Sequence, residues 1–242
     1  MKRLIILIII LISVPLPYVS TISAAEPDEH IQQLMSSFTW DIRFGFSATG
    51  TYVYNPQADG KSLDGYTKDT QVGHFFGLYG YYNREKLFFK TGVGLSRNKS
   101  TFYVDLNSWD PDAESVKEIG ISLSSYNLFV PIQAGIHIIN KPPYSMSVYS
   151  GPKFMFPFTS SYISTFIGLE NQDITENLSD FIWGWTIGFT IRTGRTMIDF
   201  EYESGINNIS EGFDGQCPQP APEQLILNRR LNILSFSYGI TF

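Results

Sequence analysis

Three acidic residues alternate with aromatic ones along a short segment of the chain: Asp199, Glu201 and Glu203. In a β-strand, a spacing of two residues places side chains on the same face. Three carboxylates on one strand face repel one another unless basic groups from neighbouring strands intervene. Similar alternation elsewhere completes a balanced set of four acidic and four basic residues on equivalent faces: Asp41, Arg43, Lys90, Lys153, Arg192, Asp199, Glu201 and Glu203.

Charged groups that point into a narrow, poorly hydrated space must be paired or hydrogen-bonded. The balance of charges therefore predicts that these eight residues form an ion-pair network that replaces a hydrophobic core. The functional alternative is a gated path for ions or small solutes along the same residues. A small closed sheet has an interior that side chains just fill, which would leave little room for such a path.

Catalytic, cofactor and metal sites find little support in the sequence. It has neither the Cys/His spacing of a metal site nor a Gly-rich phosphate loop, so no cofactor is expected. An acyl-modifying enzyme needs a histidine, a nucleophilic serine and an acidic partner within reach. His30 lies in the leader segment, His74 stands beside Phe75 and Phe76, and His137 has inward parity near a strand end. None has a serine two residues away on its own strand face, so we interpret His137 as a hydrogen-bonded interior residue and predict no enzyme.

An export signal opens the chain. Residues 1–3 are basic after Met1, residues 4–14 form a nearly unbroken apolar run, and residues 23–25 offer a small-residue cleavage site. This pattern predicts a cleaved signal peptide over residues 1–25. The apolar run is shorter than the about 20 residues that a membrane-spanning helix needs. Residues 26–37 would then form a short periplasmic segment.

The composition excludes some partners. The formal net charge is −6, and removing Lys2 and Arg3 leaves 15 basic against 23 acidic residues, which argues against nucleic acid. Mean hydropathy is −0.05, as expected where every second residue faces a polar interior. Aromatic residues make up 15% of the chain, which favours strands and interfacial belts. The single Cys217 cannot form an internal disulfide.

The last segment has the clearest strand pattern. Leu234, Phe236 and Tyr238 alternate with small polar residues, and the chain ends in Phe242. At the end of an exported chain, this pattern is typical of the strand that closes an outer-membrane barrel. Comparable alternation predicts eight strands, near residues 38–54, 70–82, 86–98, 119–139, 144–159, 181–193, 196–206 and 228–242. Both faces of the second strand are apolar, so its inward face is ambiguous.

Short and long connections alternate between these strands. Residues 83–85, 140–143 and 194–195 are tight links with turn residues, whereas the other links are long: residues 55–69, 99–118, 160–180 and 207–229. In bacterial barrels the short turns and both termini face the periplasm, and the long loops face outside. The sequence therefore predicts an all-β fold over residues 38–242. It is an eight-stranded antiparallel up-and-down transmembrane β-barrel in a Gram-negative outer membrane.

Three segments resemble the PorT-like outer-membrane β-barrel family. They are Tyr126 to Gly135, where in that family a Tyr, an apolar residue and a Pro precede a strand; Phe181 to Ile209, with Trp183, Gly188, Arg195, Asp199, Tyr202 and the exit Asn207-Asn208-Ile209-Ser210; and the closing residues 228–242. The resemblance implies an eight-stranded barrel of the Gram-negative outer membrane. Some members of that family are linked to a protein-secretion system, and many have no known activity.

Two classes of function follow. The first is a non-enzymatic barrel that serves as a membrane anchor or as a partner-binding, assembly or secretion component. The second is a lipid A-modifying enzyme with its active site at the barrel rim. The expected partners are outer-membrane lipid and lipopolysaccharide, and the barrel-assembly machinery through the strand that ends in Phe242. A periplasmic or secretion-system protein is a further candidate.

Overall fold

The structure is a computed structural model, and its compact unit runs from Ser37 to Phe242. The described residues are 37–58, 60–63, 66–105, 118–141, 143–163, 175–214 and 225–242. The predicted signal peptide (residues 1–25), the segment that follows it as far as residue 36, and Cys217 lie outside these residues. Within the described ranges, no helix is long and apolar enough to cross a membrane.

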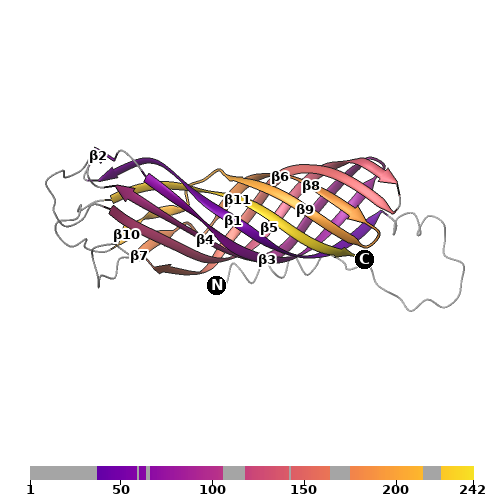
Figure 1. The fold of residues 1–242 in the computed structure, drawn as a ribbon, viewed down its shortest axis with the longest axis horizontal. Helices are drawn as coiled ribbons and strands as arrows, with labels where there is room; N and C mark the ends of the chain where they lie inside the picture. Colours follow the sequence, from indigo (N-terminus) through magenta and orange to yellow (C-terminus); the bar gives the residue numbers. More distant parts are fainter. Residues whose placement is uncertain are drawn as a thin grey trace, which may run out of the picture. The chain divides into compact units, whose positions relative to one another are not determined.

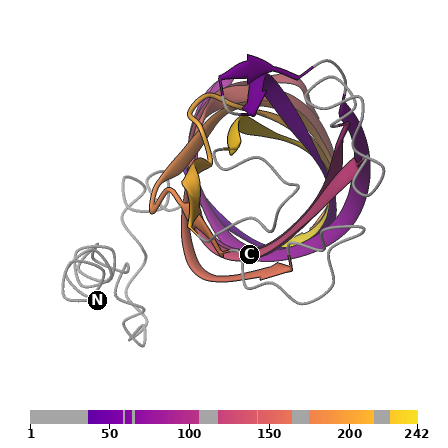
Figure 2. The ribbon, with the colours of Figure 1, turned by 90° about the vertical axis from the view of Figure 1, so that its left-hand side faces the viewer.

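Eight long strands close into one antiparallel barrel, which confirms the predicted fold class (Figures 1 and 2). Each strand pairs with its neighbour in the sequence, and the last pairs with the first. The strands are β1 (Phe38–Ala58), β3 (Tyr66–Arg84), β4 (Leu87–Asp105), β5 (Glu118–Lys141), β6 (Tyr144–Ile163), β8 (Ile182–Thr193), β9 (Thr196–Gly205) and β11 (Leu225–Thr241).

The strands run obliquely around the barrel because their registers are staggered (Figure 1). A path of paired residues runs once around the sheet, from Arg97 of β4 through His74 of β3 and Phe46 of β1. The path returns to β4 at Leu87, ten residues from its start. For a closed barrel such a stagger requires tilted strands, at about 35–45° to the axis. The tilt sets an interior that side chains can fill.

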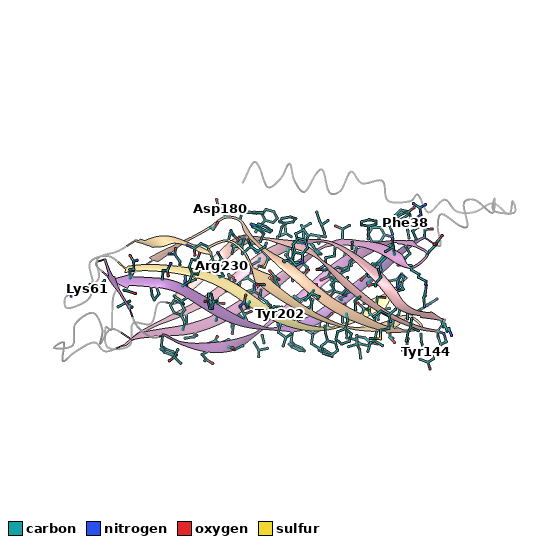
Figure 3. The ribbon with its side chains drawn as sticks, turned by 90° about the horizontal axis from the view of Figure 1, so that it is seen from above. Phe38, Lys61, Tyr144, Asp180, Tyr202 and Arg230 are labelled. Atoms are coloured by element: carbon teal, nitrogen blue, oxygen red, sulfur yellow. The ribbon has the colours of Figure 1, made fainter. Side chains whose placement is uncertain are left out.

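Alternation along the strands divides the barrel into an apolar outer surface and a polar interior. Phe38, Tyr144 and Tyr202 point away from the barrel (Figure 3). On β11, Phe236 is 44% exposed, whereas the next residue, Ser237, is 2% exposed. Aromatic side chains on the outside and hydroxyl groups on the inside are expected of a barrel that is surrounded by lipid and has a polar lumen. Ten of the buried apolar side chains form one cluster inside the barrel: Tyr79, Tyr81, Phe88, Phe129, Tyr149, Met155, Ile182, Ile209, Leu231 and Ile233.

The structure resolves the inward face of β3, which the sequence left ambiguous. Tyr79 and Tyr81 point inward and are 5% and 6% exposed, while Leu78 faces outward. The ring of Tyr79 lies under the guanidinium of Arg43, with 4.5 Å between Cζ and the ring centroid. A tyrosine suits a charged lumen because its ring face attracts cations and its hydroxyl is polar.

Four of the strands, β1, β3, β4 and β6, continue well beyond their predicted ends, so the predicted long loops are shorter than expected, whereas β5 nearly keeps its predicted bounds. β5 has 24 residues, and β1, β3, β4 and β6 have 19 to 21, whereas a membrane-spanning strand needs about 9–11. Beyond lipid both faces meet water, so the alternation that marks a strand weakens while backbone pairing continues. Three short strands lie between the long ones: β2 (Lys61–Ser62) pairs with β1, and β7 (Thr175–Leu178) pairs with β10 (Ser210–Asp214).

The orientation can be tested by cysteine labelling. We expect Ser62→Cys, in β2, to react with a membrane-impermeant maleimide on intact cells, and Lys86→Cys, in the tight turn after β3, to react only after permeabilisation. Both positions are exposed, and the reason for the difference is that short turns face the periplasm. A Cys217→Ser background removes the native thiol. If Lys86→Cys were labelled on intact cells, the short turns would face the outside and the assigned orientation would be wrong.

Candidate functional site

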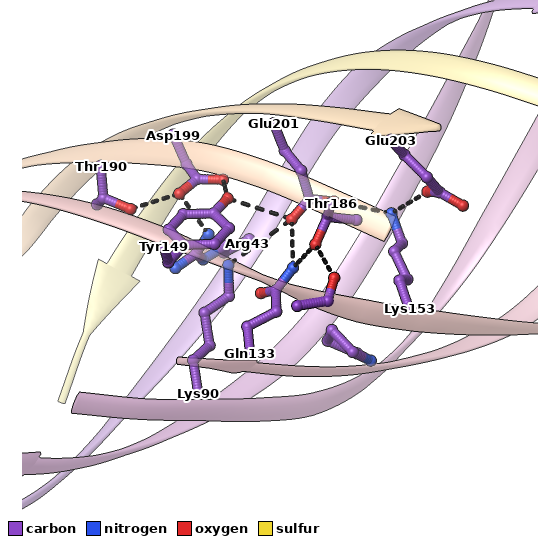
Figure 4. A network of polar contacts seen from close by, with 12 residues as sticks. Arg43, Lys90, Gln133, Tyr149, Lys153, Thr186, Thr190, Asp199, Glu201 and Glu203 are labelled. Carbon is purple, nitrogen blue, oxygen red and sulfur yellow. Dashed lines mark hydrogen bonds and ion pairs between the residues drawn. The ribbon is translucent and has the colours of Figure 1, made fainter. Parts of the chain in front are cut away.

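The structure places all eight predicted charged residues on the inner face of the barrel. Seven of them are no more than 9% exposed, and Arg192 is partly exposed. They come from β1, β4, β6, β8 and β9, and most of them meet in one polar network that crosses the lumen (Figure 4).

Lys153 joins two of the three carboxylates of β9. Its Nζ lies 2.9 Å from Oε1 of Glu201 and 3.0 Å from Oε2 of Glu203. Lys153 stands on β6, one strand beyond β8, and its partner on β8 is Gly184. A Cβ at Gly184 would lie 2.9 Å from Cγ of Glu203. The missing side chain therefore leaves room for Glu203 and for the lysine that reaches across β8.

Glu201 is the most connected carboxylate. Besides Lys153, it accepts hydrogen bonds from Nε2 of Gln133 at 3.0 Å and from the hydroxyl of Tyr149 at 3.2 Å. Its Oε2 also lies 3.8 Å from Nζ of Lys90. The carboxylate is thus held by groups from β4, β5 and β6, so it links its own strand to the opposite side of the sheet.

Arg43 and Asp41 connect the first strand to the last three. Nη1 of Arg43 lies 2.9 Å from Oδ1 of Asp199, and its Nη2 lies 3.1 Å from Oδ2 of Asp41. Oδ1 of Asp41 accepts a hydrogen bond from the Thr241 hydroxyl at 2.7 Å and pairs with Arg192 at 3.4 Å. These contacts lie across the β1–β11 seam, where the barrel closes.

Lys90 is held by aromatic rings more than by oxygen atoms. Its Nζ lies 3.5 Å from the ring centroid of Tyr149 and 5.2 Å from that of Tyr79, and it has no hydrogen-bond partner among the described residues. A desolvated cation over an aromatic face is attracted by the ring quadrupole. The sequence predicted the inward position of Lys90 but not these rings, because the inward face of β3 was ambiguous.

The arrangement brings the repelling carboxylates of β9 together with cations from neighbouring strands. Arg43 pairs with Asp199, Lys153 and Lys90 surround Glu201, and Lys153 also pairs with Glu203. Among the described residues, no group of three or more His, Cys, Asp and Glu could hold a metal ion. The network has the chemistry of a plug: it holds strands together by paired charges across the lumen.

A second polar cluster lies near the short turns around His137, which the sequence predicted to be hydrogen-bonded but whose partners it did not reveal. Nδ1 of His137 is 2.8 Å from Oγ of Ser147, and its Nε2 is 3.3 Å from Oδ1 of Asn83. Ser147 stands on β6, directly opposite His137 of β5. Ser147 is on a different strand from His137, so the spacing along one strand does not relate them. The register of the β5–β6 hairpin is the signal that could have predicted the contact.

The closed eight-stranded barrel, with an apolar lipid-facing surface and a charged, filled lumen, defines an integral outer-membrane β-barrel protein. The family model described as "outer membrane protein beta-barrel domain" matches residues 28–211, and the chain belongs to that family. Its place is the outer membrane of a Gram-negative bacterium. No curated protein matches the sequence.

Solved structures of outer-membrane proteins match this chain at low sequence identity. OprG from Pseudomonas aeruginosa matches with a TM-score of 0.55 and 10% identity, over 85% of this chain and 96% of that chain. Neisserial surface protein A matches with a TM-score of 0.38 and 12% identity, over 84% of this chain and 97% of that chain. Ail of Yersinia pestis matches with a TM-score of 0.37 and 13% identity, over 85% of this chain and 99% of that chain. The likeness to OprG shows the barrel fold. The narrower PorT-like membership stays a prediction.

Proposed function

We propose that this protein is a closed, non-conducting membrane anchor that presents a binding surface to a partner. The observation that carries the proposal is the network of paired charges across the lumen, in which Lys153, Glu201 and Arg43 are 9%, 9% and 1% exposed. An open water-filled path would leave such side chains hydrated. A place in a secretion system, to which some PorT-like proteins are linked, is the narrower form of this proposal.

The extended strands support a partner at the outer end of the barrel. β4 and β5 pair from Leu87 with Ile136 as far as Asp105 with Glu118. That ladder is longer than the about 9–11 residues per strand that cross a membrane. A paired sheet outside the lipid offers a stiff surface, and stiff surfaces lose less conformational freedom on binding. The short turns offer the second surface, toward a periplasmic or secretion-system protein.

Two outward-facing arginines favour lipopolysaccharide as the lipid partner. The guanidinium of Arg97 lies 5.2 Å from the ring centroid of Tyr126, and that of Arg230 lies 4.8 Å from that of Tyr54. Arginine on an aromatic ring is well suited to bind phosphate. The barrel-assembly machinery is the proposed partner of β11, which ends the strand order.

The two alternative functions have less support. A pore would need space where the described side chains form ion pairs. An enzyme at the lipid-facing rim would need a histidine with a serine there. His74 is the described histidine that faces outward, and no described residue makes a hydrogen bond to its side chain. Both observations favour the anchor.

Two measurements test the anchor. In planar bilayers the purified barrel should give no regular conductance steps, because paired charges fill the lumen; an open porin serves as the positive control. A photo-crosslinking residue at Ser62 or Lys86 should capture a defined protein in the native membrane from one end of the barrel. Regular conductance steps of the wild type that change when Lys153 is replaced would establish a pore. If no protein were cross-linked at either end of the barrel, the proposal that it binds a partner would be wrong.

A further inference from the structure

The cluster of Asn83, His137 and Ser147 is used neither by the ion-pair network nor by the proposed anchor. It lies beside the short turns. The backbone N–H of His137 donates to the carbonyl of Lys86 at 2.8 Å, and the N–H of Asn83 donates to the carbonyl of Ser37 at 2.7 Å. Ser147 is 5% exposed, whereas His137 and Asn83 are partly exposed. The cluster therefore reaches solvent at the periplasmic mouth of the lumen.

The hydrogen bonds fix which nitrogen of His137 carries the proton. Nδ2 of Asn83 donates to the carbonyl of Ser37 at 3.4 Å and to the hydroxyl of Thr39 at 3.3 Å. These bonds turn Oδ1 of Asn83, which can only accept, toward Nε2 of His137. Nε2 must then be the N–H, and Nδ1 carries the lone pair. That lone pair faces the Ser147 hydroxyl, so Ser147 donates its proton to Nδ1.

Packing holds this arrangement in place. The ring of Phe88 lies against the imidazole of His137, with 4.9 Å between the ring centroids and 32° between the planes. A small cavity is lined by the three cluster residues and also by Arg192, Thr190 and Tyr81. Arg192 gives that cavity a positive side chain. The cavity is thus lined by a nucleophile, a base, a residue that orients the base, and a cation. These are the groups that acyl transfer requires.

We propose that Ser147 is a base-activated nucleophile and that this cluster hydrolyses slender acyl esters that enter from the periplasm. Oγ of Ser147 forms a bond to the ester carbonyl carbon while its proton moves to Nδ1 of His137. The negative charge on the carbonyl oxygen develops in the cavity beside Arg192. When the C–O bond breaks, the alcohol leaves with the proton from Nδ1. Water then attacks the acyl-serine, gives a proton to Nδ1, and releases the carboxylic acid as Ser147 regains its hydroxyl.

The size of the cavity sets the class of substrate. The space beside Ser147 is small and mostly walled by side chains such as Phe88 and Tyr81, so branched or bulky acyl groups would not reach Oγ. The free volume of the cavity is about 10 Å³, close to the space of one water, so an ester could bring only the carbonyl end of a short linear acyl group to Oγ, from the side where His137 and Asn83 are partly exposed. Asn83 acts through His137, and it is therefore a positioning residue: it selects the tautomer that leaves Nδ1 free to accept.

The test uses a fluorophosphonate probe and p-nitrophenyl acetate on the full-length barrel folded in detergent. We expect phosphonylation at Ser147, located by peptide mass spectrometry. Ester hydrolysis should fall at least tenfold in Ser147→Ala and in His137→Ala. Ser204→Ala is the matched control, because Ser204 is an exposed serine of β9 that does not line this cavity. It should keep the wild-type rate. Asn83→Ala should slow labelling, and Asn83→Asp should restore it because the carboxylate also accepts from Nε2.

Heat-modifiable migration in gels shows that each variant is a folded barrel, so loss of activity can be separated from loss of structure. A folded wild type whose Ser147 stays unmodified by the probe would overturn the proposal. Equal hydrolysis by wild type and Ser147→Ala would do the same. Neither result bears on the anchor, which depends on conductance and cross-linking.

Discussion

Replacing Lys153 with methionine should lower the free energy of unfolding of the barrel by about 3–5 kcal/mol, because it leaves buried carboxylates without their cation. Nζ of Lys153 lies within 3.0 Å of both Glu201 and Glu203, and Glu203 is 1% exposed. Lys153 is the only described cation within ion-pair distance of Glu203. Urea unfolding in lipid vesicles, followed by tryptophan fluorescence, measures the loss.

A control and a double variant show whether the missing charge pair is the cause. Lys86→Met, in an exposed turn, should change stability by no more than about 0.5 kcal/mol. Adding Glu203→Gln to Lys153→Met should recover part of the loss, because one of the unpaired charges disappears. If Lys153→Met unfolded at the wild-type urea concentration, the lumen would be hydrated enough to screen the carboxylates, and the plug in the proposed function would be wrong.

The inward faces that the sequence predicted share one property. Asp199, Glu201 and Glu203 alternate strictly with Ile198, Phe200 and Tyr202, so only one parity puts charge away from lipid. Turning these carboxylates toward lipid would cost much free energy, and in the structure they lie inside the barrel. On β3 either face would place aromatic residues in the lipid, so the two orientations do not differ in this way. Tyr79 points inward because Arg43 and Lys90 lie there, which no local pattern contains.

The contacts between strands were harder to predict than the faces. The neighbour of His137 across the sheet depends on the turn that joins β5 and β6, and on an irregular register between His137 and Ile139. A shift of one residue would move Ser147 to the opposite face. The charges could thus be assigned to the lumen from the sequence, whereas the partner of each charge, and the cluster at the periplasmic mouth, required the three-dimensional register.

Strand ends were predicted too early for a physical reason. Within lipid, each residue is selected to be apolar outside and polar inside, and this produces the alternation. Outside lipid the backbone ladder can continue while both faces are polar, as along β4 from Asn98 to Thr101. The predicted end at residue 98 therefore marks where the lipid-facing alternation weakens rather than where the strand ends.

Deleting residues 238–242 should prevent the barrel from closing. These residues pair with Asp41 to Phe44 of β1 on one side, and three of them pair with Thr196 to Ile198 of β9 on the other. Phe242 also exchanges two backbone hydrogen bonds with Trp40, at 3.3 and 2.8 Å. In lipid, each backbone group that loses its partner costs several kcal/mol, so an open edge is not tolerated. The truncated chain should be exported yet show no heat-modifiable migration and no outer-membrane fractionation.

A triple alanine variant at Tyr238, Ile240 and Phe242 separates the ladder from recognition by the assembly machinery. It removes the aromatic and aliphatic side chains but keeps every backbone hydrogen bond of β11 with β1. Refolded from urea into detergent, where no assembly machinery is present, the triple variant should still show the heat shift, and the truncated chain should not. In cells the triple variant should reach the outer membrane poorly if those side chains are recognised during assembly. A truncated chain that keeps its heat shift in detergent would mean that the seam between β1 and β11 closes without its last residues. The ladder beyond residue 237 would then not be needed to seal the barrel.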